Sequence, residues 1–165
     1  MSGHRTERDK FLKISVGSVA PDFSLESNIG HKVSLSEFRG KKNVVLYFYP
    51  KDETMGCTKE ACSFRDSYDV FKGLNTEVIG VSSDSPDSHR KFAEHHKLPF
   101  ILLSDPEKKV RKLYDVRSNM GIIPGRVTYI ISRGGIILHI FNSQTRPEEH
   151  VREALRILDK ERSSE

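Results

Sequence analysis

The sequence has few cysteines, no long apolar run and no apolar stretch at its start, and each absence argues against a class of protein. Two cysteines in 165 residues are too few for a disulfide-stabilised scaffold. No apolar run approaches the ~18 residues of a membrane span, so we expect no membrane partner. The first dozen residues are polar and basic, so we expect no secretory signal. We therefore predict a cytoplasmic protein, with a plastid or mitochondrion as the alternative if a transit peptide has been removed.

The chain also lacks a concentrated charge of one sign. Its net charge is +4, but 27 basic residues are interleaved with 23 acidic residues along the whole length. A basic cluster at residues 108–112 fits the solvated face of a helix, and no aromatic residues are interleaved with it. We therefore expect no nucleic-acid partner.

Apolar patterns predict buried strands that alternate with helices. Residues 43–49 form a near-continuous apolar run, which is typical of a strand covered on both faces. Ser85 and Pro86 are suited to cap and open a helix. The expected elements are a hairpin with strands at 21–25 and 31–35, strands at 43–49, 76–82 and 100–103, helices at 57–72, 86–97 and 108–114, hairpin strands at 126–131 and 136–141, and a helix after Pro147.

This element order predicts a single α/β domain. Buried strands that alternate with helices imply three layers, with helices on both faces of a central mixed β-sheet and a β-hairpin at the N-terminal end. We expect this domain to span residues 14–165 and to follow a flexible tail at residues 1–13. A loop is expected after the helix at 108–114, through Gly121.

The two cysteines, Cys57 and Cys62, have a spacing that fits neither a Cys-x-x-Cys redox motif nor a zinc site. Cys57 follows a strand and a turn, so we expect it in the first turn of a helix, where unpaired N–H groups and the helix dipole favour a thiolate. In an ideal helix the two Cα atoms would lie ~8.7 Å apart, at positions ~140° apart around the axis. A disulfide needs Cα atoms closer than ~7 Å. Either the thiols never bond, as two unrelated buried cysteines, or the start of the helix must open.

Metal binding has little support in the sequence. His89, His95 and His96 lie on one predicted helix with mostly polar neighbours, and no set of residues has the spacing of a known metal site. We therefore expect neither a metal nor another cofactor.

The residues around the thiols resemble a known family. The pattern Pro50-x-x-x-Thr54-x-x-Cys57 is similar to the active-site signature of the peroxiredoxins, and Glu60 with Cys62 makes it resemble their bacterioferritin comigratory protein branch, also called peroxiredoxin Q. The resemblance covers about residues 14–160. It also includes the segments at residues 20–23, 104–106, 124–129 and 141–144.

The resemblance implies a thioredoxin-like fold and a peroxidase that reduces hydrogen peroxide and organic hydroperoxides. It implies that Cys57 is the peroxidatic nucleophile, which becomes a sulfenic acid, and that Cys62 resolves it as an intramolecular disulfide. Thioredoxin or a similar dithiol protein would be the reductant, in antioxidant defence and redox homeostasis. The resemblance suggests a monomer, with a weak dimer as the alternative.

The same resemblance assigns supporting roles to four residues. Arg126 is expected beside the sulfur, where its multi-donor guanidinium stabilises the thiolate and holds the peroxide. Thr54 would bond to the sulfur and the peroxide oxygen, although a helix N-cap would also explain it. Pro50 would exclude water without contributing an N–H group, although it is also a plain strand terminator. Glu60 would orient Arg126, although a surface glutamate in a first helical turn is also common.

Two points stay open at the level of sequence. Met55 stands where the branch usually has proline, so the loop before the helix is expected to be more mobile. Two other functions remain as alternatives: a disulfide oxidoreductase acting on protein thiols, and a non-enzymatic redox sensor. Insulin reduction would identify the first, and an absence of steady turnover with thioredoxin would identify the second.

Overall fold

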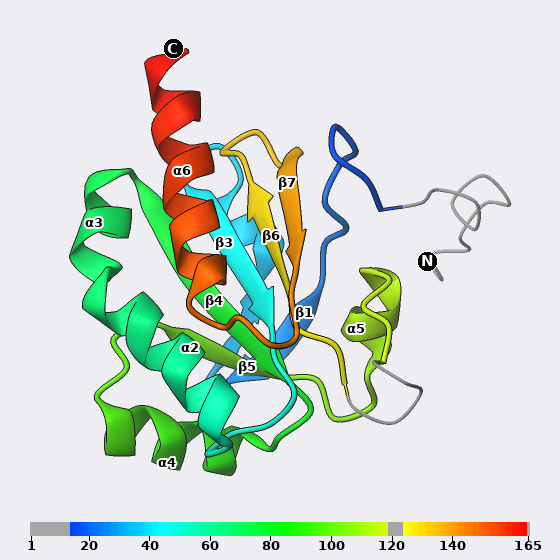
Figure 1. The fold of residues 1–165 in the computed structure, drawn as a ribbon. Coiled ribbons are helices and arrows are strands. Elements are labelled where there is room, and N and C mark those ends of the chain that lie inside the picture. Colours follow the sequence, from blue (N-terminus) through cyan, green and yellow to red (C-terminus); the bar gives the residue numbers. More distant parts are fainter. Residues whose placement is uncertain (1–13, 119–123, 165) are drawn as a thin grey trace, which may run out of the picture.

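The computed structural model of the protein describes residues 14–118 and 124–164 (Figure 1). The expected tail at residues 1–13 and the end of the loop expected through Gly121 lie outside the described residues. A central sheet with strand order β2-β1-β5-β4-β3-β6-β7 carries helices on both faces. The strands are β1 (Ser24–Ser27), β2 (Lys32–Ser34), β3 (Asn43–Phe48), β4 (Thr76–Ser82), β5 (Ile101–Ser104), β6 (Val127–Ile131) and β7 (Ile137–Asn142).

The sheet is mixed, as the element order predicts. β3, β4 and β5 pair in parallel at its centre, and β6 and β7 extend it antiparallel beyond β3. The N-terminal hairpin of β1 and β2 pairs antiparallel with β5 at the other side. The parallel strands are covered on both faces, which explains why nearly every residue of β3 and β4 is buried.

Side chains that alternate along β3 build two separate cores. Val45, Tyr47 and Tyr49 pack with the helices of one face, whereas Val44 and Phe48 belong to the core on the other face. Helices α2, α3, α4 and α6 cover the first face, and α5 lies on the second (Figure 1). The helices are η1 (Leu35–Phe38), α2 (Met55–Asp66), α3 (Tyr68–Gly73), α4 (Pro86–His96), α5 (Lys109–Leu113) and α6 (Glu149–Ser163).

Most predicted elements are present with boundaries shifted by a few residues, but the single helix expected at residues 57–72 is wrong. It is two helices that meet at Ser67, whose backbone (φ −101°, ψ 5°) leaves the helical region. The break separates two packing partners, because α2 contacts α6 whereas α3 contacts β4. The predicted cap of α4 is confirmed, since the Ser88 N–H donates to Ser85 Oγ over 3.1 Å. Within the described ranges, no helix is long and apolar enough to cross a bilayer.

Candidate active site

The register of the sheet brings distant segments of the chain to one edge. Phe48, at the end of β3, pairs with Val127 at the start of β6, and Val127 pairs with Asn142 at the end of β7. The residues just beyond these pairs therefore lie together: the loop after β3, Arg126 before β6, and the segment after β7. The loop after β3 leads directly into α2, which carries both cysteines.

Cys57 lies in the first turn of α2 and contacts Arg126. Its thiol is buried (1% exposed), and Arg126 Nη2 donates to Cys57 Sγ over 3.4 Å. Gly56 makes this contact possible, because a Cβ at that position would lie 2.9 Å from Arg126 Nη2. A positive guanidinium and a helix N-terminus both face the sulfur, and both favour a thiolate.

Glu60 completes a buried row with Arg126 and Cys57. It follows Cys57 by one helical turn on the same face, so both side chains point toward β6. Arg126 Nη1 donates to Glu60 Oε1 over 2.7 Å, and both residues are buried. Burial raises the pKa of Glu60 to about 8, although Arg126 acts to lower it. The alternative of a surface glutamate is therefore excluded, because Glu60 is fully buried and bonded to Arg126.

His150, which sequence reasoning missed, lies on the other side of Glu60. Its Nδ1 is 3.6 Å from Glu60 Oε2, an oxygen with no hydrogen-bond partner among the described residues. His150 Nε2 donates to the Ser143 carbonyl over 2.8 Å, and Nδ1 lies 2.7 Å from Thr128 Oγ1. Burial lowers the pKa of His150 to about 4, so the ring is neutral at pH 7 and Nδ1 accepts the threonine hydroxyl. In the sequence, the burial of His150 could have been predicted from its place on the apolar stripe of α6.

Arg111 is a second guanidinium near the site, and its burial corrects the expectation that residues 108–112 form a solvated face. Arg111 Nη1 donates to the Gly125 carbonyl over 2.9 Å, and Nη2 donates to the Tyr49 carbonyl over 2.8 Å. Its guanidinium also lies 5.8 Å from the centroid of the Phe48 ring. Arg111 thereby joins the segment before β6 to the end of β3, which fixes the spacing between Arg126 and the loop.

The other predicted site residues, Pro50, Thr54 and Cys62, make no side-chain hydrogen bond to Cys57 or Arg126 in the described part of the chain. Pro50 is half-buried at the end of β3. Thr54 occupies the N-cap position of α2, but its hydroxyl donates to the Lys51 carbonyl over 2.8 Å and makes no capping bond with any described residue. Cys62 lies further along α2, half-buried, and both cysteines are free thiols. The structure therefore brings Cys57, Arg126 and Glu60 into direct contact, and it leaves Cys62 apart on the same helix.

Among the described residues, two clusters contain residue types that bind metals. Asp52, Asp84 and His89 form the buried one. Its Asp52 carboxylate already accepts hydrogen bonds from the Tyr49 and Ser88 hydroxyls and faces His89 Nδ1, so it serves as an internal brace for the loop after β3. The second cluster, Glu53 with His95 and His96, lies at the surface.

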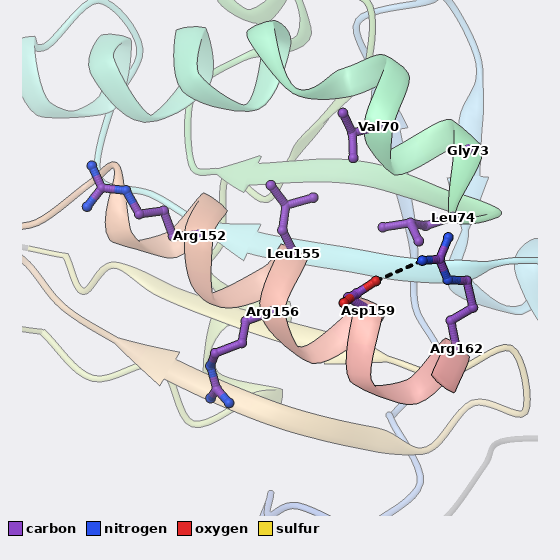
Figure 2. Close-up of a pocket in the computed structure, with 8 residues that line it drawn as sticks. All are labelled: Val70, Gly73, Leu74, Arg152, Leu155, Arg156, Asp159 and Arg162. Atoms are coloured by element: carbon purple, nitrogen blue, oxygen red, sulfur yellow. Dashed lines mark hydrogen bonds and ion pairs between the residues drawn. The ribbon is translucent and has the colours of Figure 1, made fainter. Parts of the chain in front are cut away.

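Among the described residues, several hollows border α6, and one of them adjoins the candidate site. A hollow of about 610 Å³ is lined by Met55, Gly56 and Lys59 and by residues 144–149. It borders Arg126, because Gly56 abuts the guanidinium and the Gln144 carbonyl accepts from Arg126 Nε over 3.3 Å. Another, of about 690 Å³, lies between α3 and α6 and contains no predicted site residue (Figure 2). In it, Val70 and Leu74 lie across from Leu155, beside the Arg162–Asp159 ion pair.

The buried neutral state of His150 predicts a pH dependence of stability. Its pKa in the folded protein, about 4, lies below the ordinary value of 6.5, so folding disfavours the protonated ring. The stability that His150 contributes is present above pH 6.5 and is lost as the pH falls toward 4. Urea denaturation measures the free energy of unfolding of the wild type and of His150→Gln. We expect the wild type to be the more stable at pH 7 and the difference between the two to shrink as the pH falls to ~4.5. Exposed His31→Gln is the control, and an advantage over His150→Gln that is the same at both pH values would contradict the assignment.

Comparisons with known proteins agree with this geometry. The model of the AhpC/TSA family matches residues 16–140. The chloroplastic peroxiredoxin Q of Sedum lineare is 51% identical over 149 residues, which cover 90% of this chain and 80% of that protein. The crystal structure of peroxidoxin BcpB from Mycobacterium tuberculosis has a TM-score of 0.82 and 33% identity, and the match covers 89% of this chain and 97% of that one.

A further structural relative is known for a particular activity. It is the bacterioferritin comigratory protein of Xanthomonas campestris, described by its alkyl peroxide reduction activity, with a TM-score of 0.78 and 27% identity over 84% of this chain and 91% of that one. These likenesses confirm the expected thioredoxin-like peroxiredoxin fold. The chain therefore belongs to the AhpC/TSA family, within its peroxiredoxin Q branch, and is a thiol-dependent peroxidase.

Proposed function

We propose that Cys57 is the peroxidatic cysteine and that Cys62 resolves its oxidised form. The observation that carries this proposal is the contact of 3.4 Å between Arg126 Nη2 and Cys57 Sγ, at a buried helix N-terminus. A sulfur nucleophile must be ionised at neutral pH, and a guanidinium is the permanent cation best suited to hold it so. Cys62 has no such neighbour among its described contacts, so the two thiols are assigned different roles.

The reaction balances with these two sulfurs alone. The Cys57 thiolate attacks one peroxide oxygen, a sulfur–oxygen bond forms, and the oxygen–oxygen bond breaks. The leaving alkoxide or hydroxide takes a proton and departs as alcohol or water. The Cys62 thiolate then attacks the Cys57 sulfenic acid, forming the disulfide and releasing hydroxide, which takes up a proton to become water. A dithiol protein such as thioredoxin returns both sulfurs to thiols and is itself oxidised.

Arg126 has two roles in this scheme. Its Nη2 stabilises the thiolate, and the same fork of donors is available to a peroxide oxygen as negative charge develops there. Glu60 fixes the orientation of the fork through its bond to Nη1. We propose that Thr54 rotates its hydroxyl from the Lys51 carbonyl toward the sulfur when peroxide binds, and that Pro50 excludes water there. No cofactor is needed.

Hydrogen peroxide and organic hydroperoxides are the proposed substrates. The hollow of about 610 Å³ beside Gly56 offers room for an organic group, and the apolar side chain of Met55 lies at its rim with 77% exposure. The alkyl peroxide reduction activity of the Xanthomonas campestris relative supports this choice. Membership of the peroxiredoxin Q branch does not favour a disulfide oxidoreductase or a non-enzymatic sensor.

Three other expectations stay predictions. We propose that residues 14–165 form the catalytic domain and that the protein is a monomer, which sedimentation of the full chain would test. The chloroplast location of the Sedum lineare relative favours a plastid over the cytoplasm, and microscopy of a fluorescent fusion would distinguish the two.

The first prediction of the proposed function separates the roles of the cysteines. Cys57→Ser is expected to abolish peroxide consumption, because a serine hydroxyl is not ionised near pH 7. Cys62→Ser should consume one equivalent of peroxide and accumulate sulfenic acid, while turnover with thioredoxin collapses. Mass spectrometry and NADPH oxidation coupled through thioredoxin reductase measure these outcomes. Full turnover in Cys57→Ser would refute the assignment.

The second prediction concerns the shape of the cation. Arg126→Lys keeps the charge but loses the fork that contacts Cys57 and Glu60 together, so we expect the rate with hydrogen peroxide to fall by ~10²-fold. Stopped-flow measurement of Cys57 oxidation tests this, and Arg117→Lys on the exposed surface is the control. An unchanged rate in Arg126→Lys would remove the fork from the mechanism.

The third prediction concerns the helix that carries both thiols. α2 is continuous from Met55 to Asp66, so the disulfide requires its first turns to open. Opening costs about 0.5–1.5 kcal/mol for each hydrogen bond lost. We expect amide exchange across residues 54–66 to accelerate on oxidation while β3 and β6 stay protected. Cys57→Ser treated with peroxide should not change, and equal protection in both redox states would show that α2 does not open.

A further inference from the structure

The surface cluster beside the active-site loop brings together three side chains with metal-binding donors. Glu53 immediately precedes Thr54, the N-cap residue of α2, and His95 and His96 are the last residues of α4. Glu53 Oε1 lies 2.9 Å from His95 Nδ1, and Oε2 lies 3.0 Å from His96 Nε2. One ligand atom from each residue lies within 4.8 Å of the other two.

These distances are close to those around a small metal ion. Imidazole nitrogen and carboxylate oxygen bind Zn²⁺ at about 2.0–2.2 Å, which places neighbouring donors of a tetrahedral site about 3.3 Å apart. The nitrogen–oxygen distances in the cluster would need to lengthen by only a few tenths of an ångström. Two imidazoles with one carboxylate favour a transition metal over Ca²⁺ or Mg²⁺, which prefer oxygen donors.

The surroundings of the cluster hold the donors in place and favour a cation. The His96 ring packs edge-on against Phe92, with 5.2 Å between the ring centroids. The centroid of the His95 ring lies 4.1 Å from that of the His96 ring. Both histidines lie at the C-terminal end of α4, where the helix dipole favours positive charge. Glu53 lies between the two rings and contacts both, so its carboxylate supplies the acidic ligand of the cluster. The Arg65 guanidinium donates to the His96 carbonyl, and its positive charge disfavours a second cation nearby.

We propose that Glu53, His95 and His96 form a surface binding site for a divalent transition-metal ion of the Zn²⁺ type, with water completing the coordination. The sequence alone argued against a metal because Glu53 lies 42 positions from His95, outside any local spacing pattern. The buried cluster of Asp52, Asp84 and His89 is a weaker candidate for a metal site. Hydrogen bonds inside the protein already engage the Asp52 oxygens and His89 nitrogens that would bind the ion.

A metal ion here would act on the redox cycle, a consequence that rests on the proposed function. Bound metal would tie the loop before α2 to α4, next to the helical turns that must open for the disulfide. Binding that favours the folded form over the opened form shifts the balance toward the folded form. The metal should therefore slow disulfide formation, while the reaction of Cys57 with peroxide proceeds.

Titration calorimetry with Zn²⁺ tests the site without the redox chemistry. The full chain carrying Cys57→Ser and Cys62→Ser is used, so that no thiolate competes for the ion. We expect one ion per chain at this site, and at least a tenfold loss of affinity when His95→Ala or His96→Ala is added. His31→Ala, a histidine exposed elsewhere, is the matched control and should leave the affinity unchanged. Absence of saturable binding, or an affinity that neither alanine variant changes, would overturn the site.

A second measurement tests the link to the redox cycle. Disulfide formation after one equivalent of peroxide is followed in the wild type and in the His95→Ala/His96→Ala double variant, each with and without Zn²⁺. We expect Zn²⁺ to slow the step in the wild type only, and an equal effect in both proteins would instead indicate binding to the thiols. A wild type without peroxidase activity would refute the proposed function but leave the calorimetric result standing. Zn²⁺ binding without slower disulfide formation would overturn the coupling alone.

Discussion

The rest of the site depends on the contacts that the buried guanidinium of Arg126 makes with Cys57 and Glu60. It lies 3.4 Å from Cys57 Sγ and 2.7 Å from Glu60 Oε1, in surroundings almost free of solvent. Removing a charge from water costs several kcal/mol unless a partner compensates it. The buried charge of Arg126 therefore depends on its contacts with Glu60 and Cys57. His150 is neutral beside them, so it adds no second cation to compete with Arg126 for Glu60.

The sheet makes this contact possible by holding segments that are distant in sequence at one edge. Pairing of Phe48 with Val127 places Arg126 beside the loop that leads into α2. Arg111 joins both segments from the opposite face through the Gly125 and Tyr49 carbonyls. Because the donors are fixed before any peroxide arrives, little reorganisation is needed when negative charge develops during the reaction.

The helix that completes the site also keeps the two thiols apart. In α2, Cys57 faces Arg126 while Cys62 lies on a different side, so the geometry that supports the proposed attack on peroxide opposes the proposed disulfide. The start of a helix is where this conflict costs least, because its first N–H groups lack helical partners. Glu53 lies directly before that turn and contacts the end of α4, which makes the loop a natural point of control over opening.

Local patterns in the sequence determined the alternation of strands and helices, the cap of α4 and the position of Cys57 in a first helical turn, because each depends on residues that are neighbours in the chain. The resemblance to the peroxiredoxins supplied Arg126 and Glu60 as candidates, but no local pattern could indicate that Glu60 is buried. Only the tertiary structure decided the features that depend on contacts between distant segments, since a basic cluster or a histidine has the same sequence pattern whether its side chain faces water or the core. These features are the break at Ser67, the buried Arg111, the neutral His150 and the cluster of Glu53, His95 and His96.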